Sequence, residues 1–160
     1  MKKTLLTFFI LIFLSTKSFS AGSGSGSGDD KSNYDKAVTL IKSAKKNEKK
    51  GKTEKAYKKY EKAQKLLIKS NDKKPNRADT LNYLGFTTRK LGDYENGEKY
   101  YLQGLAIEPN HKGINEYLGE LYVATNRHNL AVERLEVLKG CSCEEYEQLK
   151  AVIAGKPSKY

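Results

Sequence analysis

A repeat with a period of 34 residues constrains this chain more than any other feature of its sequence. The dipeptide Leu84-Gly85 returns as Leu118-Gly119, 34 positions later. At the same offset, small residues align with small residues, and apolar and turn residues align likewise: Gly97 with Ala131, Tyr101 with Leu135, and Gly92 with Asn126. The apolar and small positions match, whereas the polar positions differ. The chain is therefore predicted to stack similar units side by side.

A further unit lies upstream, at an offset of 41 residues. The aligned residues are Ala44 with Gly85, Gly51 with Gly92, Glu54 with Glu95, Ala56 with Gly97, Tyr60 with Tyr101, and Ala63 with Gly104. The longer offset adds about two helical turns at 3.6 residues per turn, so a longer helix still presents the same face. The three predicted units are residues 37–77, 78–111 and 112–141.

Each unit divides into two helices joined by a tight turn. In the second unit, apolar residues recur at helical spacing over 78–91 and over 94–107, and Gly92-Asp93 supplies a turn between them. Pro109 ends the second helix because proline cannot continue it. Interior glycines such as Gly97 and Gly104 each cost about 0.5–1 kcal/mol relative to alanine. We interpret them as packing residues, placed where neighbouring helices approach closely.

These positions resemble the tetratricopeptide repeat (TPR) family, in an exported bacterial form. The residues that carry the resemblance are Leu84, Gly85, Gly92, Tyr94, Gly97, Tyr101, Gly104 and Pro109 in the second unit, and Leu118, Gly119, Tyr122, Asn126, Ala131 and Leu135 in the third. Two departures stand out, because Pro75 comes late in the first unit and Gly140-Cys141 replaces the proline of the third. The resemblance implies an all-α fold, a short right-handed α-solenoid of three helix-turn-helix repeats.

The two ends of the chain are predicted to lie outside the repeats. Residues 142–154 carry Tyr146, Leu149 and Val152 on one face and are predicted to form a C-terminal capping helix, followed by a tail over 155–160. Residues 1–20 have the basic start, the apolar run over 5–14 and the small residues of a secretory signal peptide. An uncleaved membrane anchor is the alternative, although the run is about half the length of a bilayer span.

The Gly/Ser-rich stretch 21–30 is predicted to be a flexible linker. With the signal peptide, it suggests a protein secreted across the inner membrane into the periplasm. The formal net charge is +11, and its source is uneven along the chain. Residues 29–77 hold 17 basic and 7 acidic residues, whereas residues 78–160 hold 10 and 12. The positive field therefore belongs to the first repeat.

The helix predicted over 53–69 carries a basic face formed by Lys55, Lys58, Lys59, Lys62, Lys65 and Lys69. One interpretation is a solvated outer face. The other is weak attraction to an anionic membrane or envelope surface, or to an acidic protein. Nucleic acid is disfavoured as a partner by the export signal.

The two cysteines, Cys141 and Cys143, lie in one Cys-Ser-Cys step before the capping helix. In an oxidising compartment they either pair with each other or stay as thiols. One interpretation is a local brace or buried thiols, and the other is a thiol–disulfide exchange site. Only His128 is placed to help them bind a metal, and a metal site needs more ligands. The sequence contains no phosphate loop, zinc spacing or catalytic signature. We therefore predict a non-enzymatic protein without a cofactor or a metal.

In the TPR family, the first helix of each repeat lines a concave groove. The repeat offsets then place nine residues along it: Ile41, Lys45, Asn82, Phe86, Arg89, Lys90, Glu116, Glu120 and Val123. The groove is expected to be basic at one end and acidic at the other. Phe86 is expected as an exposed aromatic anchor near its middle. These mixed charges do not match the lysine/asparagine clamp by which some family members bind a C-terminal carboxylate.

The sequence therefore predicts an exported, non-enzymatic interaction module that binds a peptide or a protein in this groove. Two alternatives stay open: a thiol–disulfide active protein that uses Cys141 and Cys143, and an anchor to an anionic envelope surface through the basic face. Dimerisation through the first helix is also open, because Val38 and Ile41 are expected to be exposed in a monomer.

Overall fold

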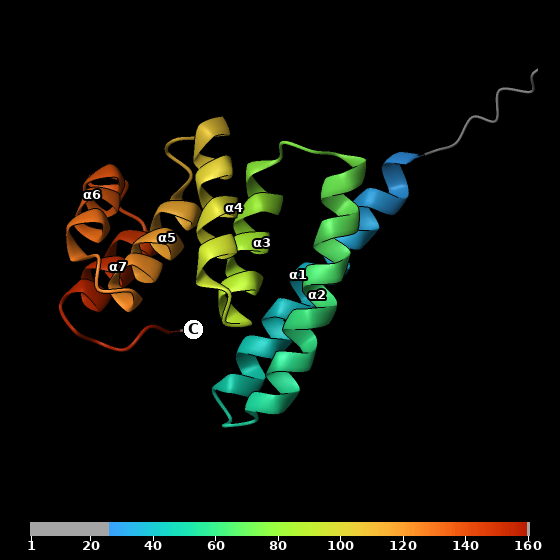
Figure 1. Ribbon diagram of the computed structural model, residues 1–160, viewed down its shortest axis with the longest axis horizontal. Helices are drawn as coiled ribbons and strands as arrows, with labels where there is room; N and C mark the ends of the chain where they lie inside the picture. Colours follow the sequence, from blue (N-terminus) through green and yellow to red (C-terminus); the bar gives the residue numbers. More distant parts are fainter. Residues whose placement is uncertain (1–25, 160) are drawn as a thin grey trace, which may run out of the picture.

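The computed structural model describes residues 26–159, and these form seven helices (Figure 1). The helices are α1 (Gly26–Glu48), α2 (Thr53–Lys73), α3 (Ala78–Lys90), α4 (Tyr94–Ile107), α5 (Lys112–Ala124), α6 (His128–Leu138) and α7 (Glu144–Ile153). No strand occurs among these residues. The predicted signal peptide, residues 1–20, and residues 21–25 of the predicted linker lie outside the described part of the chain.

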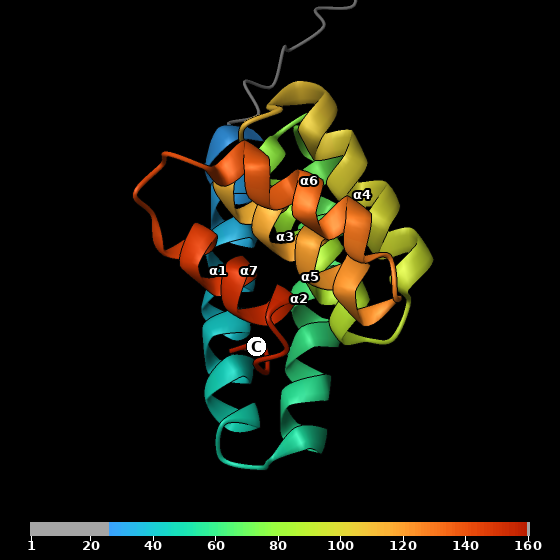
Figure 2. The same ribbon diagram turned by 90° about the vertical axis from the view of Figure 1, so that its left-hand side faces the viewer.

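Consecutive helices pair into three hairpins, α1–α2, α3–α4 and α5–α6, which stack in chain order (Figures 1 and 2). Helix α7 packs against both α5 and α6 and closes the stack. The fold is therefore all-α and solenoid-like with a C-terminal capping helix, as the sequence predicts. The first hairpin is the longest and extends beyond the others in Figure 1.

Helix α1 begins at Gly26, inside the stretch 21–30 that the sequence predicts as a flexible linker. The structure therefore extends the helix into residues 26–30 of the predicted linker. The side chains of Asn33, Ala37 and Ile41 are buried, so the middle of α1 is held by packing. Extending a helix that already exists costs less than nucleating one, which allows turns of poor intrinsic propensity to join it.

The turns between paired helices share one backbone conformation. Gly51, Gly92 and Asn126 have φ values of +68°, +94° and +59°, and they occupy the same position in the three hairpins. This left-handed region favours glycine and asparagine, which explains why the first two turns have glycine at this position and the third has asparagine. After the second turn, the Asp93 side chain accepts a hydrogen bond from the Asn96 backbone N–H and caps α4.

The interior glycines mark places where another residue fills the space of a missing side chain. A Cβ atom on Gly85 would lie 2.5 Å from the Tyr101 ring, and one on Gly104 would lie 2.4 Å from the Ile114 side chain. A Cβ on Gly97 would lie 3.2 Å from the Gly85 carbonyl oxygen. These glycines therefore let α3 and α4 pack closely and let α5 reach α4, which confirms their interpretation as packing residues.

The third hairpin uses α7 for the same purpose. A Cβ atom on Gly119 would lie 2.5 Å from Leu149, a fully buried residue of α7. Leu135, which aligns with Tyr101 in the repeat, is only half-buried. The capping helix therefore supplies the apolar side chain that the second helix of the other hairpins supplies itself.

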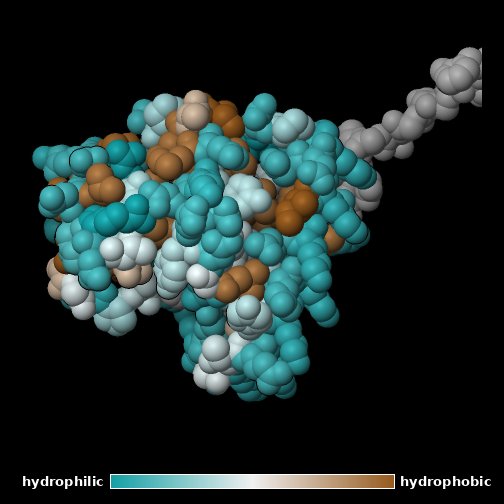
Figure 3. All heavy atoms as spheres, viewed as in Figure 1, coloured by the Kyte–Doolittle hydropathy of each residue, from teal (hydrophilic) through white to brown (hydrophobic). Residues whose placement is uncertain are grey.

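The surface outside this core is mostly polar. The face shown in Figure 3 is largely hydrophilic, with hydrophobic residues in small, separate patches. Within residues 26–159, none of the helices combines the length and the apolar character that a membrane span requires.

Substituting Gly85→Ala tests the packing role of the interior glycines. Helix propensity alone would stabilise the protein by about 0.5–1 kcal/mol. Because the new methyl group would overlap the Tyr101 ring, we expect instead a loss of about 1–3 kcal/mol in the free energy of unfolding, measured by urea denaturation. Gln103→Ala, at an exposed position of α4, serves as the control and should change stability by less than about 0.5 kcal/mol. A stabilised Gly85→Ala protein would contradict the packing role.

Candidate functional site

The predicted groove residues belong to α1, α3 and α5, but most of them are buried. Asn82, Arg89, Glu116 and Glu120 have relative exposures of 6%, 8%, 3% and 2%. Lys45, Lys90 and Val123 are half-buried. Ile41 is also buried, at 1% exposure, so the expectation of an exposed Ile41 that favours dimerisation is wrong; Val38 is half-buried.

Phe86 is fully buried, and the prediction that it is an exposed anchor is wrong. Its ring packs between Tyr60 and Tyr117, with centroid separations of 5.7 and 5.0 Å. The Lys45 ammonium lies 4.4 Å from the centroid of the same ring, in a cation–π contact. Phe86 therefore joins the three hairpins in the core, because its ring on α3 contacts residues of both the first and the third hairpin.

Charged side chains from different hairpins meet beside this aromatic cluster. Arg89 donates to Glu120 at 2.9 Å, and both side chains are almost completely buried. Nearer the solvent, Lys90 pairs with Glu48 at 2.7 Å, and the Glu48 carboxylate also accepts from the Tyr60 hydroxyl at 2.6 Å. Removing one member of a buried pair leaves the other charge without compensation. This network therefore fixes how the three hairpins sit against each other.

Burial also shifts the pKa values of two charged side chains on this face, Lys45 and Glu116. The Lys45 ammonium donates to the Tyr117 hydroxyl at 3.0 Å. Burial lowers the pKa of Lys45 to about 8, although the charges of Glu116 and Glu120 oppose the change. Burial likewise raises the pKa of Glu116 to about 8, and the negative charges of Glu120 and Glu145 add to it, against Lys45 and Arg89.

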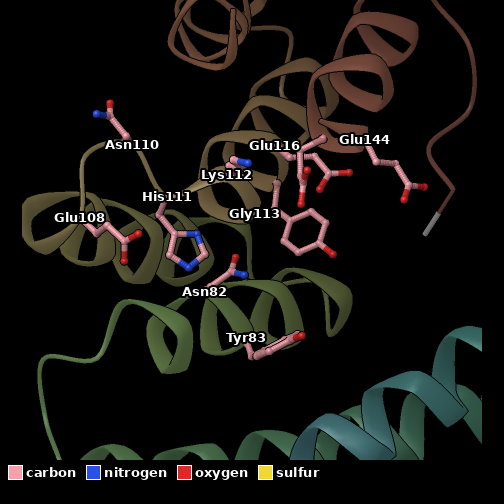
Figure 4. Close-up of a pocket in the computed structure, with 11 residues that line it drawn as sticks. Asn82, Tyr83, Glu108, Asn110, His111, Lys112, Gly113, Glu116 and Glu144 are labelled. Atoms are coloured by element: carbon pink, nitrogen blue, oxygen red, sulfur yellow. The ribbon is translucent and has the colours of Figure 1, made fainter. Parts of the chain in front are cut away.

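A cleft of about 400 Å³ opens beside these residues. Its lining comes from α3, the turn before α5, α5 itself and the start of α7: Asn82, Tyr83, Glu108, Asn110, His111, Lys112, Gly113, Glu116, Tyr117, Glu144 and Glu145 (Figure 4). Two of these residues, Asn82 and Glu116, were predicted from the repeat. The turn residues and the residues of α7 were missed because the repeat offsets carry no information on where α7 lies. Tyr83, Lys112, Gly113 and Tyr117 lie on α3 and α5 but outside the rows that the repeat offsets aligned.

Two buried oxygens of the cleft-lining residues lack a hydrogen-bond partner among the described residues. They are Oδ1 of Asn82 and Oε1 of Glu116. His111, in contrast, is fully engaged: its Nδ1 accepts from the Ile114 backbone N–H at 3.1 Å, and its Nε2 lies 3.2 Å from Asp79. His111 therefore caps α5, and the two buried polar atoms of the cleft-lining residues that lack a partner are both acceptors.

The C-terminal tail folds back over the same side of the molecule. After α7 the chain turns at Gly155, which has a φ of +82°, and returns toward α3 and α5 (Figure 1). The Ser158 hydroxyl donates to Oε1 of Glu120 at 2.9 Å, and the Lys159 ammonium pairs with Glu144 at 2.7 Å. A second hollow, of about 360 Å³, lies beside this segment between Glu48, Lys90 and Ser158.

The predicted basic face lies on α2. Lys55, Lys58, Lys62, Lys65 and Lys69 are exposed, whereas Lys59 is half-buried and donates to the Ser43 hydroxyl. Lys58 forms an ion pair with Glu54, one turn away on the same helix. The lysines thus form an exposed surface on the outside of the first hairpin.

Cys141 and Cys143 are joined by a disulfide in the turn between α6 and α7. Both residues are half-buried, and neither is a free thiol in the structure. The described part of the chain contains no group of three or more histidine, cysteine, aspartate or glutamate side chains placed to hold a metal ion.

Comparison with known proteins supports the fold at the level of overall architecture. No family model matches the sequence, and no curated protein matches it. Among solved structures, the first TPR domain of Spaghetti (RPAP3), solved bound to the HSP90 peptide SRMEEVD, is similar, with a TM-score of 0.52 and 18% sequence identity. The match covers 76% of this chain and 95% of that chain. The protein therefore has a TPR-like fold.

Phe86→Ala is expected to act on stability. Truncating a fully buried aromatic ring that joins three hairpins should lower the free energy of unfolding by about 3–5 kcal/mol in urea denaturation. Leu102→Ala is the control, because Leu102 is 47% exposed on α4, and it should change stability by less than about 0.5 kcal/mol. A Phe86→Ala protein of unchanged stability would mean that the ring is not part of the core.

Glu116→Gln is expected to change how stability depends on pH. The pKa of Glu116 is raised from 4.5 to about 8 on folding, so the folded state binds a proton more tightly than the unfolded state. The wild type therefore loses stability as the pH rises from 4.5 to 8. Glutamine has no proton to lose, so the variant and the wild type should have the same free energy of unfolding near pH 4.5.

Near pH 8, the Glu116→Gln variant should be more stable than the wild type by at least about 1.4 kcal/mol, the equivalent of one pKa unit. The measurement is urea denaturation at a series of pH values. Glu147→Gln, which alters an exposed residue of α7, should follow the wild type throughout. Parallel pH profiles for the wild type and Glu116→Gln would contradict the raised pKa.

Proposed function

We propose that this protein is a non-enzymatic interaction module that binds an extended peptide segment of a partner protein on the face formed by α3, α5 and α7. The observation that carries the proposal is the chain's own tail, which lies as a non-helical segment on this side. Through Ser158 and Lys159 it contacts acidic residues of α5 and α7. A surface that binds one non-helical segment by side-chain hydrogen bonds has the chemistry to bind another.

The shape of the site agrees with this proposal. The cleft of about 400 Å³ continues the face beyond the tail, and its size suits a few side chains of a peptide. The similar TPR domain was itself solved with a peptide bound, which supports the same general use of the fold. We further propose, from the signal-peptide pattern of residues 1–20, that the protein acts after export, in the periplasm.

The basic face on α2 supports a second, weaker contact with an anionic membrane or envelope surface, because its five exposed lysines lie together on the outside of the first hairpin. This contact would be long-range and strongly weakened by salt. It lies on α2, not on α3, α5 or α7, so it does not compete with a peptide in the cleft.

Selection of random heptapeptides displayed on phage, followed by NMR titration of the selected peptides, tests the main proposal. We expect the perturbed backbone amides to cluster on Asn82, Tyr83, Gly113 and Glu116, around the cleft. Amides near Leu102 and Val132, which are exposed on α4 and α6, are the internal control and should not shift. A selection without enriched peptides, or shifts confined to α4 and α6, would overturn the proposed function.

A further inference from the structure

The two unpartnered oxygens in the cleft indicate the chemistry of its ligand. Asn82 and Glu116 have side chains that are more than nine-tenths buried, yet Oδ1 of Asn82 and Oε1 of Glu116 lack a partner among the described residues. Both atoms are acceptors. A buried acceptor without a donor is unfavourable, so a ligand that supplies donors at this position gains more than it would at the surface.

The charge around the cleft is mainly negative, which also favours a ligand that carries donors. The carboxylates of Glu108, Glu116, Glu144 and Glu145 line it, against a single lysine, Lys112. Glu116 is the buried member of this group, and a low local dielectric strengthens the attraction of its carboxylate for a cation. The raised pKa of Glu116 has the same cause, because burial without sufficient opposite charge disfavours its carboxylate. A carboxylate ligand would add to this imbalance, whereas a cationic side chain would relieve it.

The tail shows a lysine in this environment. Lys159 lies on the non-helical segment after α7, and its ammonium contacts the Glu144 carboxylate at 2.7 Å. Glu144 also lines the cleft. The edge of the cleft therefore already pairs with a lysine of a non-helical segment, in a solvent-exposed ion pair, whereas Asn82 and Glu116 supply buried acceptors.

We propose that the cleft binds a lysine or arginine side chain of a basic peptide segment, with Asn82 and Glu116 as buried acceptors and Glu144 and Glu145 at the opening. This inference rests on the proposed function, because it names the residue type for which the peptide-binding face is selective. The partner is accordingly a basic segment of another protein, and an acidic C-terminus is disfavoured.

Blocked pentapeptides of the form Gly-Gly-X-Gly-Gly, at millimolar concentration and followed by NMR, provide the test. X is lysine, arginine, citrulline or glutamate. Citrulline keeps the shape of arginine and removes its charge. Titrations are run above pH 8, the pKa to which burial raises Glu116. We expect the lysine and arginine peptides to shift the amides of the cleft, and the citrulline and glutamate peptides to bind at least about tenfold more weakly.

Three variants separate the role of the buried acceptors from that of the general charge. Glu116→Gln should weaken binding of the lysine peptide about tenfold or more, and Asn82→Leu should weaken it as well. Glu147→Gln removes the same charge from an exposed position outside the cleft and should leave the affinity unchanged. Urea denaturation of each variant confirms that it is folded at the temperature of the titration.

Several outcomes would overturn the inference. Equal binding of the lysine and glutamate peptides, no shifts with any of the four, or equal losses in Glu116→Gln and Glu147→Gln would each do so. Heptapeptides that bind the cleft but lack lysine and arginine would overturn it while the proposed function stands, whereas a selection without cleft-binding peptides would remove both. A wild type that self-associates, does not bind the lysine peptide and loses its self-association on Glu116→Gln substitution would identify a second copy of the chain as the occupant of the cleft. That result would also overturn the inference.

Discussion

The close approach of paired helices is the constraint on which the rest of this structure depends. Gly85 leaves room for the Tyr101 ring, and Gly97 lies against the backbone of Gly85. Gly119 leaves the same room for Leu149 of α7. Each glycine weakens its own helix by less than about 1 kcal/mol, whereas each buried side chain that it admits contributes about 1.5–3 kcal/mol. The balance favours the glycines, and it sets the distance between α3 and α4 and between α5 and α7.

This close packing turns the concave side into an interior. Once α1 and α5 pack against α3, Phe86 is enclosed by Tyr60 and Tyr117, and Arg89 is enclosed with Glu120. Charged residues on the inner faces must then find partners across the hairpins. Most of them do, through ion pairs and tyrosine hydroxyls. Asn82 and Glu116 each have a buried side-chain oxygen without a partner among the described residues, and both residues line the cleft. The candidate site is thus the part of the inner face that internal contacts leave unsatisfied.

Much of the fold could be predicted from periodicity. The 34-residue repeat, the turn residues at Gly92 and Asn126, and the small residues at Gly85 and Gly97 each have one physical explanation, and together they define stacked hairpins. The candidate site was less predictable. The repeat offsets selected Asn82 and Glu116, but they could not tell which inner residues stay accessible. Phe86 was therefore expected at the surface, although it lies in the core.

The sequence by itself determined the helices, their pairing and the packing glycines, because these depend on local spacing and on residue size. It also determined that the chain carries its positive charge in the first repeat. Only the tertiary structure decided where α7 and the tail lie, and hence which acidic residues surround the cleft. The physical reason is that burial and charge compensation depend on contacts between residues far apart in the chain. Glu116 and Glu145, Ser158 and Glu120, and Lys45 and Tyr117 are such pairs.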